Sequence, residues 1–149
     1  MGRARSGPEA QLVADYLGRI DRAGRPHGLG PADVVEIEDK RGGGPAAEAA
    51  LLARCVPDGA AVCALDERGR MLNSPQLAER VAAWRDAGRP CAAFLVGGAD
   101  GLDPDLLARA DTVLSLGPMV WPHMLARAML AEQLYRAVTI LAGSPYHRA

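Results

Sequence analysis

Cysteine and aromatic residues are scarce in this sequence. The three cysteines, Cys55, Cys63 and Cys91, are widely spaced and form no CxxC pair, so the sequence suggests neither a disulfide framework nor a zinc site. We expect these thiols to be reduced and mostly buried, and we expect no bound metal. Aromatic residues make up 4% of the chain, too few for the stacking platforms on which many single-strand RNA-binding domains depend.

Long apolar runs and an excess of one charge are also lacking. No stretch of about 18 apolar residues could span a bilayer, and the N-terminal sequence MGRARSGPEA lacks the apolar core of a secretory signal. We therefore predict a cytoplasmic protein without membrane contact. Seventeen basic and 18 acidic residues give a formal net charge of −1, so any contact with RNA must use local patches instead of a broad basic surface.

The remaining composition is that of one α/β domain. The 149 residues are 49% hydrophobic, enough for a single core. Apolar periodicity and turn-forming residues predict helices over 8–23, 46–56, 74–87 (with Ser74 as the N-cap), 103–109 and 122–142, and strands over 33–38, 60–65, 91–96 and 112–116. The run CAAFLV at 91–96 does not alternate, as expected for a strand covered on both faces of a parallel sheet. The alternation of strands and helices predicts an open, largely parallel sheet with a site at the carboxyl ends of its strands.

A glycine-rich segment follows the strand expected at 91–96. Gly97, Gly98 and Gly101 precede a helix, a setting in which missing side chains let backbone amides approach a ligand closely. The spacing GGxxG fits neither the dinucleotide fingerprint GxGxxG nor the phosphate loop GxxxxGK[ST]. A tight strand-to-helix turn is the simpler interpretation.

The segment SLGPMVWPH at 115–123 leads from an apolar strand through Gly117 and Pro118 to Trp121 and a helix start. A loop this apolar either is a packed connector or wraps a ligand. The last helix carries Arg127, Glu132, Gln133, Tyr135 and Arg136, and the chain ends SPYHRA. Such a tail is usually frayed, yet its side chains are of the kinds that stack on bases and pair with phosphates. Lys40 and Arg41 are equally open to two interpretations, as solvated charge or as phosphate contacts.

Taken in order, the segments VGGADGL, LSLGPMVWPHMLARAMLAEQLYRA and SPYHRA resemble the ribosomal large-subunit (23S) pseudouridine N3-methyltransferase family of the SPOUT superfamily. The likeness extends upstream through LDERGRMLNSPQLAERV and the KRGG loop. It implies a single SPOUT domain over residues 1–149, with helices on both faces of the sheet and a trefoil knot near the C-terminus, a rare exception to unknotted chains. It also implies an obligate homodimer that methylates N3 of a pseudouridine, on the assembled ribosome.

The resemblance further implies that S-adenosylmethionine is held in the knot, chiefly by backbone groups of three loops. These loops map to Leu65, to Gly97 with Gly98, and to Leu116, Gly117, Pro118, Met119, Val120 and Trp121. Leu116, Met119 and Trp121 would form an apolar adenine pocket. The resemblance motivates a catalytic role for His147, Tyr146 and Arg136, with RNA contacts from Lys40, Arg41, Glu132 and Arg148.

Two departures from the family pattern carry expectations of their own. Relatives begin with an extra apolar strand of roughly eight residues ahead of the segment that matches Gly2 to Pro8, and without it we expect a neighbouring backbone segment to lack a partner. The loop GPMVW is also less polar than in relatives, which affects side-chain contacts at Gly117 and Val120. Two rival functions stay open from the sequence: a Rossmann-type nucleotide-binding enzyme, and a non-catalytic ribosome-associated factor.

Overall fold

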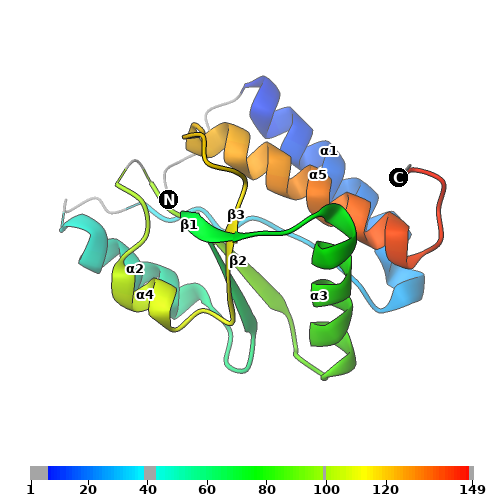
Figure 1. Cartoon of the computed structure of the whole chain (residues 1–149), viewed down its shortest axis with the longest axis horizontal. Coiled ribbons are helices and arrows are strands. Elements are labelled where there is room, and N and C mark those ends of the chain that lie inside the picture. The colour runs from blue at the N-terminus through cyan, green and yellow to red at the C-terminus, as the bar shows by residue number, and fades with distance from the viewer. Residues whose placement is uncertain (1–6, 39–42, 99, 148–149) are drawn as a thin grey trace.

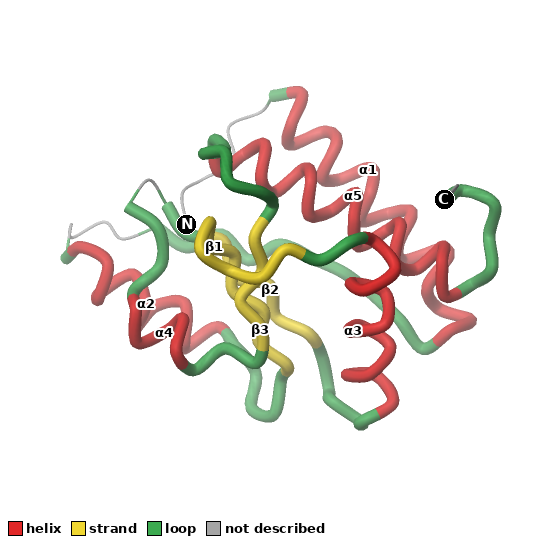
Figure 2. Tube along the Cα trace, in the orientation of Figure 1, coloured by secondary structure: helices red, strands yellow, loops and turns green. Residues whose placement is uncertain are grey.

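A computed structural model of the chain describes residues 7–38, 43–98 and 100–147. In these residues, three parallel strands form an open sheet in the order β2-β1-β3, with helices on both faces (Figures 1 and 2). The strands are β1 (Ala61–Met71), β2 (Ala92–Val96) and β3 (Thr112–Ser115), and the helices are α1 (Pro8–Gly24), α2 (Gly44–Cys55), α3 (Ser74–Asp86), α4 (Pro104–Ala108) and α5 (His123–Leu141), with a 3-10 turn at Arg25–His27. The expected α/β class and parallel sheet are confirmed.

Each face of the sheet buries its own cluster of apolar side chains. Because successive residues of a strand point to opposite faces, Ala64 of β1 packs toward α2 and α4, whereas Cys63 packs toward α3 and α5. The first cluster contains Ala49, Leu52, Ala64, Leu95, Leu102 and Leu106; the second contains Ala61, Cys63, Leu77, Trp84, Leu114 and Leu130. Helix α1 lies outside the second layer and packs along α5 (Figure 1).

Two of the local expectations are wrong. Residues 33–38 form no strand: although the sequence has β-branched residues at the right places, no neighbouring strand in the described part of the chain pairs with it. Val34 and Val35 are accordingly exposed. The N-cap of α3 is Asn73 and not Ser74, because the Asn73 side chain accepts from Gln76 N at 2.9 Å while Gln76 Oε1 accepts from Asn73 N at 3.0 Å.

The expectation of mostly buried cysteines is also wrong, since only Cys63 is buried while Cys55 and Cys91 are exposed. Burial raises the pKa of the Cys63 thiol to about 12, so little reactive thiolate forms at neutral pH. We predict that an alkylating reagent added to the native protein labels Cys55 and Cys91 and spares Cys63, whereas all three react after denaturation. Peptide mass spectrometry would measure this, and rapid native labelling of Cys63 would contradict the packing of β1.

No helix among the described residues is long and apolar enough to cross a membrane. In the same residues, no group of three or more histidine, cysteine, aspartate and glutamate side chains lies together as a set of metal ligands.

Candidate cofactor and substrate site

The carboxyl ends of β2 and β3 lie on either side of Leu65, a residue within β1. Leu65 of β1 is in register with Val96 of β2 and with Leu114 of β3. Because the strands are parallel, the loops that begin at Gly97 and Leu116 start beside Leu65. The structure therefore brings together the three segments in which the family resemblance places a cofactor.

Gly97 stands where a side chain would not fit. A Cβ atom there would lie 2.6 Å from the carbonyl carbon and oxygen of Gly101. The loop 97–101 is closed by a bridge between Gly98 and Gly101, in which Gly101 N donates to Gly98 O at 3.2 Å. The segment forms a tight turn between β2 and α4, and the same geometry places backbone without side chains at the edge of the sheet.

The loop 116–121 leaves apolar groups uncovered and one polar group unpaired. Gly117 adopts a φ of +113°, a conformation that favours glycine. The side chains of Met119 and Val120 are 62% and 84% exposed. The indole Nε1 of Trp121 is buried and donates to no acceptor in the described part of the chain, which is costly unless a further group satisfies it. The loop has the character of a surface that a ligand or another chain covers.

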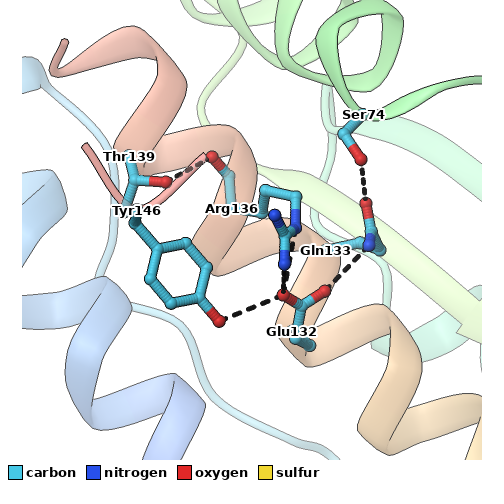
Figure 3. A network of polar contacts seen from close by, with 6 residues as sticks. All are labelled: Ser74, Glu132, Gln133, Arg136, Thr139 and Tyr146. Carbon is cyan, nitrogen blue, oxygen red and sulfur yellow. Dashed lines mark hydrogen bonds and ion pairs between the residues drawn. The ribbon is translucent and has the colours of Figure 1, made fainter. Parts of the chain in front are cut away.

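Glu132, at the middle of α5, gathers polar side chains from three parts of the chain (Figure 3). Its Oε1 accepts from Arg136 Nε at 3.0 Å, from Arg136 Nη2 at 2.6 Å and from the Tyr146 hydroxyl at 3.1 Å. Its Oε2 accepts from Gln133 Nε2 at 2.8 Å, and Gln133 Oε1 accepts from Ser74 Oγ at 2.7 Å, which links the cluster to α3. We call these five residues the tail cluster, because they hold the C-terminal segment against α5.

Aromatic contacts strengthen this attachment. The Arg136 guanidinium carbon lies 4.9 Å from the centroid of the Tyr146 ring, and the rings of Tyr135 and Tyr146 are 4.8 Å apart at an interplanar angle of 63°. Tyr16 of α1 extends the group, with its ring 6.0 Å from that of Tyr135. The described part of the tail, which ends at His147, is therefore packed and not frayed.

The protonation states within the tail cluster follow from its contacts. Burial, together with hydrogen bonds to Tyr16 and Glu132, raises the pKa of Tyr146 to about 12. The phenol is therefore neutral at physiological pH and serves as a donor to Glu132. The hydrogen bond to Glu132 also raises the pKa of Arg136, so the guanidinium stays charged. His147 follows Tyr146 in the tail. Its Nδ1 is buried and has no hydrogen-bond partner among the described residues.

The remaining candidate site residues either lie apart from the tail cluster or lie outside the residues that the structure describes. Lys40, Arg41 and Arg148 lie outside the described residues. Arg127 pairs with Glu36 at 3.2 Å, which attaches the segment 33–38 to α5.

The comparisons with known proteins agree with this arrangement. The model of a family described as "Predicted SPOUT methyltransferase" matches residues 1–147. The chain belongs to the SPOUT methyltransferase family. It is 66% identical to the "Ribosomal RNA large subunit methyltransferase H" of Dinoroseobacter shibae and 64% identical to the proteins of that name from Ruegeria pomeroyi and Paracoccus denitrificans, in each case over 99% of this chain and 95% of the relative. The expected family and enzyme class are confirmed.

In this SPOUT methyltransferase, the loop 116–121 and the tail occupy opposite ends of one helix. The loop leads into the N-terminal end of α5 at His123, whereas the tail leaves the C-terminal end and folds back to Glu132 (Figures 1 and 3). Glu132 lies nine residues after His123, which is about 14 Å along the helix axis. No hydrogen bond, ion pair or ring contact within the described chain joins the tail cluster to the loop. Two groups of predicted site residues are thus each assembled, but apart from one another.

Sequence reasoning missed Ser115 and Gly69 in this SPOUT methyltransferase. A Cβ atom on Gly69 would lie 2.8 Å from backbone atoms of Val113 and Leu114. A glycine inside a strand is a known sign of close backbone approach, but the strand expected from the sequence ended at residue 65, and the charged residues around Gly69 hid its continuation. Ser115 carried no comparable sign.

Proposed function

We propose that this chain is an S-adenosylmethionine-dependent methyltransferase that acts on N3 of a pseudouridine in large-subunit ribosomal RNA. The observation that carries the proposal is that Leu65 of β1 lies beside the starts of the two loops at Gly97 and Leu116, on one edge of the parallel sheet. The names of the full-length relatives support the choice of substrate. A ribosomal substrate would place the enzyme in the cytoplasm.

The residues at this edge fit the cofactor. Gly97 and Gly98 offer backbone groups without side chains, Met119 offers an uncovered apolar surface, and the unpaired Nε1 of Trp121 offers a hydrogen-bond donor. We assign binding to Leu65, Gly97, Gly98 and the loop residues Leu116, Gly117, Pro118, Met119, Val120 and Trp121. When bound, S-adenosylmethionine supplies an electrophilic methyl group, so the task of the protein is to orient the acceptor nitrogen and exclude water.

The acceptor nitrogen must lose its proton, and His147 is our candidate base. Tyr146 is held neutral by its raised pKa and donates to Glu132, and Arg136 is engaged by the same carboxylate. We infer that these groups hold the tail in position and present charge to the RNA, and that His147, whose Nδ1 is buried without a hydrogen-bond partner among the described residues, takes the proton of the acceptor nitrogen. Lys40, Arg41 and Arg148 would contact phosphates. A net charge of −1 suits an enzyme that recognises an assembled particle by its shape more than by a broad positive electrostatic field.

We further propose that the active form is a homodimer in which the tail of one copy completes the pocket of the other. The separation of the tail cluster from the loop 116–121 along α5 favours this arrangement. So does an apolar cavity of about 220 Å³ between α1, residues 34–36 and the start of α5, lined by Ala10, Val13, Ala14, Leu17, Val34 and Met124 with the Glu36–Arg127 pair. Leu12 and Leu125, which are exposed by 47% and 38%, adjoin this region in sequence.

The trefoil knot belongs to the proposal as well. Leu114 of β3 pairs with both Leu65 and Arg70 of β1, so β1 contacts β3 on both sides of a short interruption. The match of the SPOUT methyltransferase family model to residues 1–147 supports a threaded arrangement of the kind that the family resemblance implies.

Calorimetric titration with S-adenosylmethionine or its demethylated product, combined with the mass in solution, tests the proposal. We expect saturable binding by a dimer, followed by methyl transfer to 70S ribosomes from cells that lack the modification. A folded dimer that binds ribosomes but no cofactor would favour the rival assignment as a non-catalytic ribosome-associated factor.

We predict that His147→Ala lowers the methylation rate by about 100-fold or more, the range expected for loss of a general base, with unchanged affinity for the cofactor. The matched control is His27→Ala, which removes an imidazole from the turn that follows α1. The deficit of the His147 variant should shrink as the pH rises, because hydroxide then removes the N3 proton. An equal rate for the His147 variant and the unmodified protein at neutral pH would rule out this role.

A further inference from the structure

Strand β1 is interrupted where it passes the end of β3. Its residue Leu65 pairs with Leu114, and after a register shift Arg70 pairs with the same Leu114. Residues 66–69 between them form a bulge, which we call the bulge 66–69. At its far end, the missing side chain of Gly69 lets β1 return to β3, because a Cβ atom would lie 2.8 Å from the backbone of Val113 and Leu114.

The bulge has a defined internal structure. Asp66 Oδ1 accepts from the backbone N of Arg68 and from its Nε, both at 2.9 Å, and Asp66 Oδ2 accepts from Arg68 Nη2 at 3.1 Å. The Asp66 side chain is 9% exposed and that of Arg68 is 72% exposed. The bidentate ion pair between Asp66 and Arg68 restrains the conformation of the bulge. A contact to any one of its residues therefore affects the position of the whole bulge.

The hydroxyl of Ser115 joins this bulge to the loop 116–121. Ser115 is 6% exposed, and its Oγ donates to Glu67 O at 3.0 Å, with Gly117 O as a second acceptor at 3.2 Å. The same Oγ accepts from Gly117 N at 3.1 Å. Main-chain groups from both segments therefore converge on one side-chain oxygen, 48 residues from Glu67 in sequence.

Gly117 makes this contact important. Gly117 adopts φ +113°, and nothing lies within 4 Å of the position that a Cβ atom would take, so its backbone is open on that side. The hydrogen bond from its N–H to Ser115 Oγ restrains the start of the loop.

We propose that Ser115 is a positioning residue that clamps the bulge 66–69 and the loop 116–121 together, so that the backbone of both is pre-formed for the cofactor. The inference rests on the proposed function of these loops. Without the hydroxyl, Glu67 O and Gly117 N lose their partner in a nearly buried place, and the two segments move independently. Binding must then order them again, which lowers the affinity.

The test is Ser115→Ala, with Thr139→Val as the matched control. Thr139 is 2% exposed, and its hydroxyl also donates to a backbone carbonyl, that of Arg136, at 2.7 Å. We expect Ser115→Ala to weaken binding of S-adenosylhomocysteine in calorimetry by about tenfold, and Thr139→Val to leave it unchanged. Ser115→Thr, which keeps the hydroxyl, should restore most of the affinity.

Hydrogen exchange gives a second readout, which reports directly on the coupling between the loop 116–121 and the bulge 66–69. In the unmodified protein, ligand binding should slow exchange of amides in both the loop 116–121 and the bulge 66–69. In Ser115→Ala at saturating ligand, the loop should still be protected while the bulge loses its protection. Equal affinities for Ser115→Ala and the unmodified protein, or equal losses for Ser115→Ala and Thr139→Val, would overturn the clamp. A failure of the unmodified protein to bind the ligand would instead refute the proposed function.

Discussion

Gly97→Ala should reduce the affinity for S-adenosylmethionine by at least about 100-fold, equivalent to about 2.7 kcal/mol. The added Cβ atom would lie 2.6 Å from the carbonyl carbon and oxygen of Gly101. Because both of these are backbone atoms, no side-chain rotation relieves the overlap, and the loop 97–101 must open. Opening breaks the hydrogen bond from Gly101 N to Gly98 O and moves the backbone that we assign to the cofactor.

The matched control for this prediction is Gly18→Ala in α1, where the nearest atom to the new Cβ atom is the flexible end of Arg22 at 3.6 Å. The same chemical change there should leave cofactor affinity unaltered and slightly stabilise the helix. Calorimetry and thermal unfolding of both variants separate loss of binding from loss of fold. A folded Gly97→Ala protein with undiminished affinity would show that the loop 97–101 is only a turn.

The sequence predicted the parts of the fold that local patterns determine. The apolar run of β2 and the spacing of apolar residues in α1 and α5 placed these elements within a few residues of their observed bounds. From the parallel order of the strands, the meeting of loops at one sheet edge followed without further information. The candidate cofactor residues were assigned through the family resemblance.

The failure at residues 33–38 has a physical cause. A strand is stable only when hydrogen-bonded to a neighbour, and a run such as DVVEIE cannot reveal whether that neighbour is present. In the structure, this segment is attached through side chains instead: Glu36 pairs with Arg127, and Ile37 packs against the cluster beneath α2. The local propensity favoured a strand, but the tertiary context, which offers no neighbouring strand in the described part of the chain, decided the outcome.

The organisation of the site depended on contacts between residues far apart in sequence. Ser115 and Glu67 are 48 residues apart, and Ser74 and Gln133 are 59 apart. Neither pair has a spacing that a local pattern could reveal. The tail was open to two interpretations for the same reason, because its attachment depends on Tyr146 reaching back to Glu132.

A heterodimer of two inactive variants should be active if the tail of one copy completes the pocket of the other. One copy would carry Gly97→Ala, which disables its pocket, and the other His147→Ala, which disables its tail. In the proposed arrangement, one of the two sites then combines an intact pocket with an intact tail from the opposite copy. We therefore expect purified heterodimers to methylate ribosomes at about half the rate of the unmodified dimer, while each single-variant homodimer stays near background.

An inactive heterodimer would contradict the shared site. If each copy supplied both the pocket and the tail of its own site, every site in the heterodimer would contain one defect, and no activity would return. Differential affinity tags on the two copies allow the heterodimer to be isolated, and a tagged unmodified dimer controls for the tags. The predicted recovery follows from the separation of the loop 116–121 and the tail cluster along α5, because a site that needs both groups must then obtain them from two chains.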